Sequence, residues 1–207
     1  MCGRYWVDES PELRSIVEEM NRSSLVSKFQ ETSAITTSGE IRPTNIVPVI
    51  ASNKAGMRTV YPMRWGFKTD KSLLINARTE TAATKPTFRE AWAAHRCIVP
   101  ASYYFEWEHF TDNSGKKKTG DMYMLQPKGD TGTWLCGLYR IEAGLPVFVI
   151  LTREPSENIR FIHDRMPLMM PKDYVGEWIN PGRKPEEMAE IACTEILFEK
   201  QVVEMAK

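Results

Sequence analysis

The chain has 207 residues, of which 42% are hydrophobic and 26% are charged, as is usual for a globular protein with a buried core. The 27 basic and 27 acidic side chains cancel, so the overall charge does not indicate a nucleic-acid partner, and any surface for one must be a local basic patch. The beginning of the chain lacks the apolar stretch of a signal peptide, and no run reaches the ~18 apolar residues of a membrane helix. We therefore expect an intracellular protein in a reducing compartment, with no membrane partner.

The first 45 residues predict a short strand, a helix and a loop, in that order. Residues 3–7 have the composition of a strand. A helix is then expected in "SPELRSIVEEM", because Ser10 can cap the first amide groups, Pro11 fits the first turn and Glu12 suits the positive helix end. The polar segment "QETSAITTSGEIRPT" that comes later is predicted to be a loop.

Strand patterns dominate from residue 46 onward. Seven strand candidates are separated by clusters of Gly, Asn, Asp and Lys: "IVPVIAS", "RTVYPMRWGF", "SLLINAR", "RCIVPASYYFEWEHF", "DMYMLQP", "TWLCGLYRI" and "LPVFVILT". Helices are predicted in "TFREAWAAH", with Thr87 as the cap, and in "SENIRFI", "PKDYVGEWI" and "KPEEMAEIA". The segment "NSGKKKTG" at 113–120 is predicted as a turn between strands, and "VVEM" at 202–205 as a last strand. We expect one α+β domain over residues 1–207, with a curved, barrel-like antiparallel sheet and helices packed outside it.

The four cysteines do not form a metal-binding pattern. Cys2, Cys97, Cys136 and Cys193 include no C-x-x-C pair, and none has a histidine at zinc spacing, so we predict neither a metal nor a cofactor. The last three lie in apolar or helix-like stretches and are interpreted as small buried hydrophobic residues.

Cys2 differs from the others because of its position. Aminopeptidases generally remove Met1 when the second residue is small, and Cys2 would then carry a free α-amine beside its thiol. Such a residue can act as a nucleophile with the amine as its base. Alternatively, the amine condenses with an aldehyde to a Schiff base and the thiol closes a thiazolidine ring. An unreactive terminus is the third possibility, and position alone does not decide among them.

Three further segments hold polar side chains suited to chemistry. In "LLINARTET", Asn76 and Arg78 lie on the same side of a predicted strand, either as a functional pair or as a satisfied polar pair in the core. In "SYYFEWEHF", Glu106 shares a strand face with Tyr104 and Glu108. The aromatic surroundings predict a raised pKa for Glu106 and proton transfer near neutral pH, unless this carboxylate points into solvent.

His163 is the histidine best placed for proton transfer. It lies at the boundary of a predicted helix in "NIRFIHDRMPLMM" and has polar neighbours. His95 and His109 are interpreted as structural or exposed.

These segments together resemble the SOS-response-associated peptidase (SRAP) family, the abasic-site processing proteins. The resemblance rests on "MCGRY", "RWGF", "INARTETA", "FREAW", "RCIVPASYYFEW" and "IHDRMP", which follow the family's order over nearly the whole chain. It implies a monomeric α+β domain that binds single-stranded DNA and crosslinks covalently to abasic sites, in the DNA damage response. It also implies a self-processing peptidase activity that exposes Cys2, a possible lyase side activity and nucleoid association.

The resemblance assigns roles to eight residues. The catalytic set is Cys2, Asn76, Glu106 and His163, and the DNA-binding set is Arg4, Arg78, Trp65 and Arg165, with Trp65 equally compatible with the core. The segment "RWGFKTDKSLLINAR" departs from the family because it lacks the Pro and Trp that many members carry after "WG". With only Lys68 and Lys71 in this short connection, we expect weaker base stacking and no fixed preference for one kind of DNA junction.

Two other functions remain open at this point. An N-terminal-nucleophile amidohydrolase or amidotransferase can also begin "MCG", but the residues that follow and "HDRMP" do not fit it. A non-catalytic single-strand binder would treat Glu106 and His163 as structural, and its affinity would not depend on Cys2. If Met1 is retained, the amine of Cys2 stays in a peptide bond and only the thiol is free.

Overall fold

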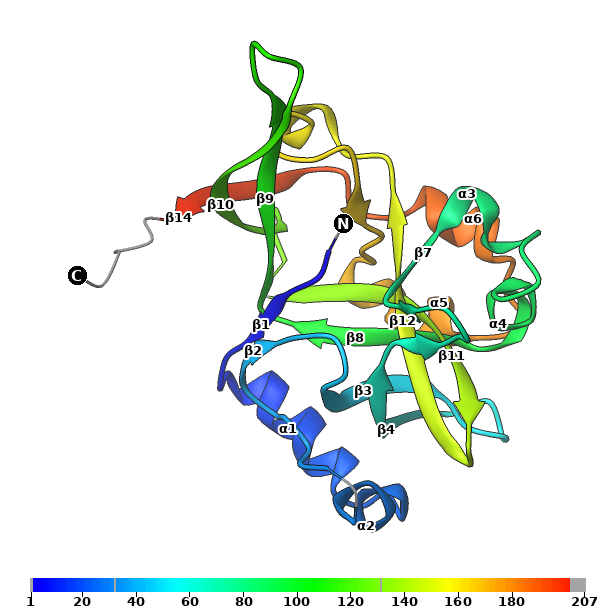
Figure 1. Ribbon diagram of the computed structural model, residues 1–207. Coiled ribbons are helices and arrows are strands. Elements are labelled where there is room, and N and C mark those ends of the chain that lie inside the picture. Colours follow the sequence, from blue (N-terminus) through cyan, green and yellow to red (C-terminus); the bar gives the residue numbers. More distant parts are fainter. Residues whose placement is uncertain (1, 32, 131, 202–207) are drawn as a thin grey trace.

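The computed structural model describes residues 2–31, 33–130 and 132–201, and it consists of two large sheets with short helices around them (Figure 1). The strands are β1 (Tyr5–Val7), β2 (Gly39–Ile41), β3 (Ile46–Ser52), β4 (Arg58–Trp65), β5 (Phe67–Lys68), β6 (Leu73–Leu74), β7 (Asn76–Arg78), β8 (Arg96–Ala101), β9 (Tyr103–Thr111), β10 (Lys117–Pro127), β11 (Thr133–Glu142), β12 (Leu145–Arg153), β13 (Met166–Pro167) and β14 (Ile196–Gln201). The helices are α1 (Pro11–Met20), α2 (Leu25–Gln30), α3 (Thr79–Ala82), α4 (Arg89–Ala94), α5 (Val175–Ile179) and α6 (Pro185–Glu190), with 3-10 turns η1 (Glu157–Ile159) and η2 (Lys172–Tyr174).

One sheet closes into a small barrel. Its strands run in the order β11-β8-β3-β4-β12, and β11 also pairs with β12, so the ring of five strands has no open edge. β8 is buried along its whole length, as expected for a strand with the barrel interior on one face and helices on the other. The predicted barrel-like α+β fold is confirmed. The antiparallel arrangement holds for most pairs, but β12 runs parallel to both β4 and β7.

The second sheet has the order β14-β10-β9-β1-β2 and grows out of the barrel. β8 and β9 are consecutive strands that meet at Ser102, where the chain passes from the barrel into this sheet. The hydroxyl of Ser102 accepts a hydrogen bond from the backbone of Asp8, and its own amide donates to the carbonyl of Trp6. This corner therefore attaches the N-terminal strand β1 to the junction of the two sheets.

Some local predictions are confirmed and others are wrong. Helix α1 begins as predicted, because the Ser10 side chain accepts from the Leu13 amide and Pro11 is the first helical residue. Thr87 is not the cap of α4, since Phe88 holds that position and provides no side-chain bond. Helix α2 was not predicted, and strand β2 lies inside the segment predicted to be a loop. The strand predicted at 202–205 lies outside the described residues.

A buried arginine joins two helix ends to the barrel. Arg96, at the start of β8, is 1% exposed, and its guanidinium lies 5.6 Å from the ring centroid of Trp178. The guanidinium donates to five backbone carbonyls, those of Trp92, Ala93, Trp178, Asn180 and Arg183. Most of these carbonyls belong to the last turns of α4 and α5, where backbone acceptors have no partner within the helix.

Candidate active site

Strand β1 carries Cys2 into the interior of the molecule. β1 lies between β9 and β2, with Tyr5 opposite Tyr104 and opposite Ile41. The pairing continues beyond the strand, because the Phe105 amide donates to the carbonyl of Arg4 over 2.9 Å. Cys2 is thereby held at 1% exposure, with its Sγ 4.0 Å from the same carbonyl oxygen.

Asn76 contacts the backbone of Cys2 from the barrel side. It is the first residue of β7, which pairs in parallel with β12 through the Asn76–Ile150 register. The Nδ2 group of Asn76 donates to the carbonyl oxygen of Cys2 over 2.9 Å. The Oδ1 atom of Asn76 is buried and accepts no hydrogen bond from the described residues. An unpartnered buried acceptor is costly, so this oxygen is available to a donor that arrives at the site.

Glu106 and His163 form a buried pair. Glu106 comes from β9 and is 5% exposed, while His163 follows η1 and is 8% exposed. His163 Nε2 lies 3.2 Å from Glu106 Oε1. Burial raises the pKa of Glu106, with a further contribution from the nearby charge of Asp164. The predicted rise in the Glu106 pKa is therefore confirmed.

The imidazole of His163 is neutral at physiological pH. Loss of solvation lowers its pKa to about 4, the neighbouring His109 and Arg165 act in the same direction, and the charge of Asp164 opposes them in part. The amide of Arg165 donates to Nδ1 over 3.0 Å, which assigns the ring hydrogen to Nε2, facing Glu106. Asp164 Oδ1 also lies 2.7 Å from Nδ1. In this tautomer Nδ1 carries no hydrogen to donate to that oxygen, and the Asp164 side chain, 83% exposed, is solvated by water instead.

The thiol of Cys2 lies within the electrostatic range of this pair. Burial raises the pKa of Cys2 to about 12, and the charge of Glu106 adds to the rise. The thiol is therefore protonated at neutral pH. The arrangement places a thiol, an amide, a carboxyl group and a neutral imidazole together, and these groups can transfer protons around Cys2.

Comparison with known protein families matches residues 1–205 to the family described as SOS response associated peptidase (SRAP). The chain belongs to the SRAP family. It is 30% identical over 194 residues to the abasic site processing protein YoaM of Bacillus subtilis, an alignment that covers 87% of this chain and 80% of the relative. It is 32% identical over 139 residues to the abasic site processing protein YedK of Escherichia coli, covering 64% and 60% of the two chains.

Solved structures share the SRAP fold at lower sequence identity. A crystal structure of a Bacteroides thetaiotaomicron protein has a TM-score of 0.72 at 21% identity and covers 96% of this chain and 91% of its own. A phage-related protein from Bordetella bronchiseptica has a TM-score of 0.69 at 20% identity, with 97% and 94% covered. These similarities support the two-sheet architecture.

The residues predicted to bind DNA differ in exposure. Arg78 is exposed at the end of β7 and has no ion pair within the described ranges. Arg4 is partly exposed, lies 4.8 Å from the Trp107 ring centroid and pairs with Glu40 at 3.4 Å. The predicted contacts of both side chains with DNA phosphates stay a prediction.

The predicted DNA contact by Trp65 is wrong. Trp65 is 0% exposed, its ring packs against Tyr5 and Phe148, and its Nε1 donates to the carbonyl of Ile75. A ring enclosed in this way cannot stack on a base, so the core alternative holds.

Arg165 holds the His163 segment in place. Its two terminal nitrogens donate to the two carboxylate oxygens of Glu80 over 2.7 and 2.9 Å, and one of them also donates to the carbonyl of Thr152. Its side chain is only 10% exposed. This paired fork fixes the backbone that bonds to Nδ1 of His163, and the predicted contact of Arg165 with DNA stays a prediction.

Three other residues at the site were not predicted to have a role there. Glu80, in "INARTETA", anchors Arg165, although nothing in its spacing indicates this partner 85 residues away. The hydroxyls of Tyr5 and Tyr104 are buried without a hydrogen-bond partner among the described residues, and burial raises the pKa of both phenols. The charge of Cys2 also contributes to both shifts, so these two donors lie near the thiol.

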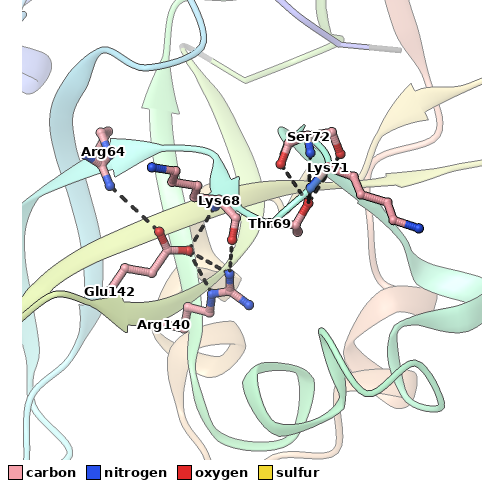
Figure 2. A network of polar contacts seen from close by, with 7 residues as sticks. All are labelled: Arg64, Lys68, Thr69, Lys71, Ser72, Arg140 and Glu142. Carbon is pink, nitrogen blue, oxygen red and sulfur yellow. Dashed lines mark hydrogen bonds and ion pairs between the residues drawn. The ribbon is translucent and has the colours of Figure 1, made fainter.

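The connection that departs from the family pattern is a tight hairpin. Phe67 pairs with Leu74 and Lys68 with Leu73, and the hydroxyl of Thr69 closes the turn by donating to the carbonyl of Ser72. Figure 2 shows that the hairpin is also fastened to β11. There the backbone of Lys68 donates to Glu142 and accepts from Arg140, whose guanidinium pairs with Glu142. Lys68 and Lys71 are exposed.

The described part of the chain has no helix long and apolar enough to cross a membrane. Within the same ranges, no group of three or more His, Cys, Asp or Glu residues is arranged to hold a metal ion.

The low pKa of His163 predicts how the stability of the protein depends on pH. The unfolded chain binds a proton at this histidine near its ordinary pKa of 6.5, whereas the folded protein binds it only near 4. Folding stability is therefore lost as the pH falls from about 6.5 towards 4. A His163→Gln variant should lose less stability over this interval, as measured by urea unfolding at pH 7 and pH 4.5. An equal loss in both proteins would contradict the lowered pKa.

Proposed function

We propose that this SRAP protein captures abasic sites in single-stranded DNA as a covalent thiazolidine at Cys2, after removal of Met1. The contacts of Asn76 with Cys2 and of His163 with Glu106 are the observation that carries the proposal. Through these contacts, the four segments that carry Cys2, Asn76, Glu106 and His163 come together in one buried region. The relatives YoaM and YedK, both named abasic site processing proteins, support DNA with abasic sites as the substrate.

The proposed reaction joins an aldehyde to an aminothiol and releases one water. The abasic deoxyribose opens to its aldehyde with proton transfer by His163. The α-amine of Cys2 attacks C1′, and the unpartnered Oδ1 of Asn76 accepts a hydrogen bond that orients this amine. Glu106, whose pKa is raised, supplies the proton with which the carbinolamine hydroxyl leaves as water.

The thiol completes the ring. Because the Cys2 thiol is protonated, the S–H group adds across the C=N bond, with sulfur bonding to C1′ and the proton passing to nitrogen. The same imine is the intermediate for β-elimination, so strand cleavage is the side reaction when ring closure is slow.

Self-removal of Met1 would use the same side chains. Arg4 and Arg78 are proposed to contact phosphates on either side of the abasic residue.

The test is the intact mass of the wild-type protein after incubation with a single strand that contains one abasic residue. The expected product has the mass of the chain without Met1 plus that of the strand minus one water, and it survives denaturation. An unchanged protein mass would overturn the proposal. Binding in a native gel without a mass change would indicate a non-catalytic binder, and absence of any DNA affinity would favour the amidohydrolase alternative.

A further inference from the structure

A hollow of about 390 Å³ lies beside the His163 pair and has no role in the reaction described above. It opens between the outer end of the β9–β10 hairpin and the segment that carries His163, which lie next to each other in Figure 1. Its lining includes His109, Thr111, Lys117 and Thr119 from the hairpin and Arg160 and Asp164 from the other side.

Four of the hairpin residues at this hollow share one face, while Phe110 and Lys118 line it from the other face. His109 lies opposite Thr119 and Thr111 opposite Lys117, and residues directly opposite each other share a face of the sheet. The ring of His109 is 4.6 Å from the ring of His163, and the His109 amide donates to the carbonyl of Ile162. The hollow therefore begins at the proposed reaction site.

The lining combines cations, hydroxyls and a flat ring. Lys117 is exposed and has no ion pair within the described ranges. Arg160 pairs with Glu157 at the surface, and Asp164 is the acidic member of the lining. Lysine and threonine side chains donate to phosphate oxygens, and a histidine ring can stack on a base. This combination suits one unit of a nucleic-acid strand.

We propose that the hollow binds the nucleotide next to the abasic residue, with its phosphate on Lys117 and its base against His109. The inference rests on the proposed function, because the abasic sugar at Cys2 fixes where its neighbour in the strand must lie. The proposed subsite lies on one side of the lesion. The affinity of the protein for a strand should therefore depend on whether a nucleotide is present on that side.

The subsite is tested by equilibrium binding of strands that carry a tetrahydrofuran residue, which has no aldehyde and cannot crosslink. One strand has nucleotides on both sides of this residue, and two others end at it, one on the 5′ side and one on the 3′ side. One of the two truncations should weaken binding to the wild type on the order of tenfold, the size of one charge-assisted hydrogen bond. In Lys117→Glu, that same truncation should cause almost no further loss.

Lys116→Glu is the matched control, since Lys116 is an exposed neighbour outside the lining. Lys116→Glu changes the charge of the hairpin by the same amount as Lys117→Glu. The affinity of this variant should fall on truncation of the strand as much as that of the wild type does. Equal responses of both variants, or a Lys117→Glu variant as sensitive as the wild type, would overturn the subsite. If the wild type still forms the adduct in that case, the proposed function stands and only the subsite is wrong. A wild type with no affinity for any of the strands would overturn both.

Discussion

A Cys2→Ala variant is expected to give no abasic-strand adduct that survives denaturation. Alanine at this position is small enough for an aminopeptidase to remove Met1, so the variant still provides an α-amine and the imine at C1′ can form. Without the thiol, no ring closes, and the imine hydrolyses when the protein is denatured. Borohydride should therefore trap the strand on Cys2→Ala, while the untreated sample shows free protein. The measurement is a denaturing gel with and without the reductant.

The matched control is Cys193→Ala, which removes a half-buried thiol that lies outside the candidate site. Its adduct should form as in the wild type. If Cys2→Ala gave as much stable adduct as the wild type without borohydride, the thiazolidine would be excluded. If the control lost the adduct as well, the effect would lie in folding, and far-ultraviolet circular dichroism of both variants separates these outcomes.

Replacement of Arg96 by methionine is expected to cause the largest loss of stability. Methionine keeps most of the aliphatic volume but provides no donor, so five backbone carbonyls, most of them at the ends of α4 and α5, lose the guanidinium as a hydrogen-bond donor. Each buried acceptor left without a hydrogen bond costs about 1–3 kcal/mol, and the sum is reduced where water can enter. A loss of at least about 4 kcal/mol is a large part of the usual 5–15 kcal/mol.

The comparison variant is Arg153→Met, because Arg153 makes one long hydrogen bond, 3.4 Å to the carbonyl of Ala189. Its free energy of unfolding in urea should change by less than about 1 kcal/mol. A similar small change in Arg96→Met would show that the carbonyl contacts contribute little. Arg96 does not touch Cys2, so the folded fraction of Arg96→Met should keep the ability to form an adduct.

The sequence predicted those parts of the fold in which local patterns are strong. Ser10 and Pro11 mark the start of α1 because capping depends on neighbouring residues alone. Helix α2 has no capping side-chain bond and only one fully buried residue, Phe29, so its sequence carries little helical signal. The parallel pairings of β12 depend on contacts between distant segments, which alternation within one strand does not indicate.

The residues of the candidate site also divide into those that local sequence patterns predicted and those whose roles depend on tertiary contacts. Cys2, Glu106 and His163 were predicted from position, aromatic surroundings and an element boundary. The burial of Trp65 was not, because an aromatic residue at the end of a strand suits the core and a base-stacking surface equally well. The role of Arg165 depends on Glu80, a partner that only the tertiary structure brings near.

The central place of β1 in its sheet has a consequence for the order in which the protein is made. β1 pairs with β9, whose residues leave the ribosome about a hundred positions later, so Tyr5 has no partner at Tyr104 until then. During that interval Cys2 lies on a nascent chain that other enzymes can reach, and afterwards it is 1% exposed. Synthesis therefore gives this cysteine an early period of free access, which ends when β9 folds beside it.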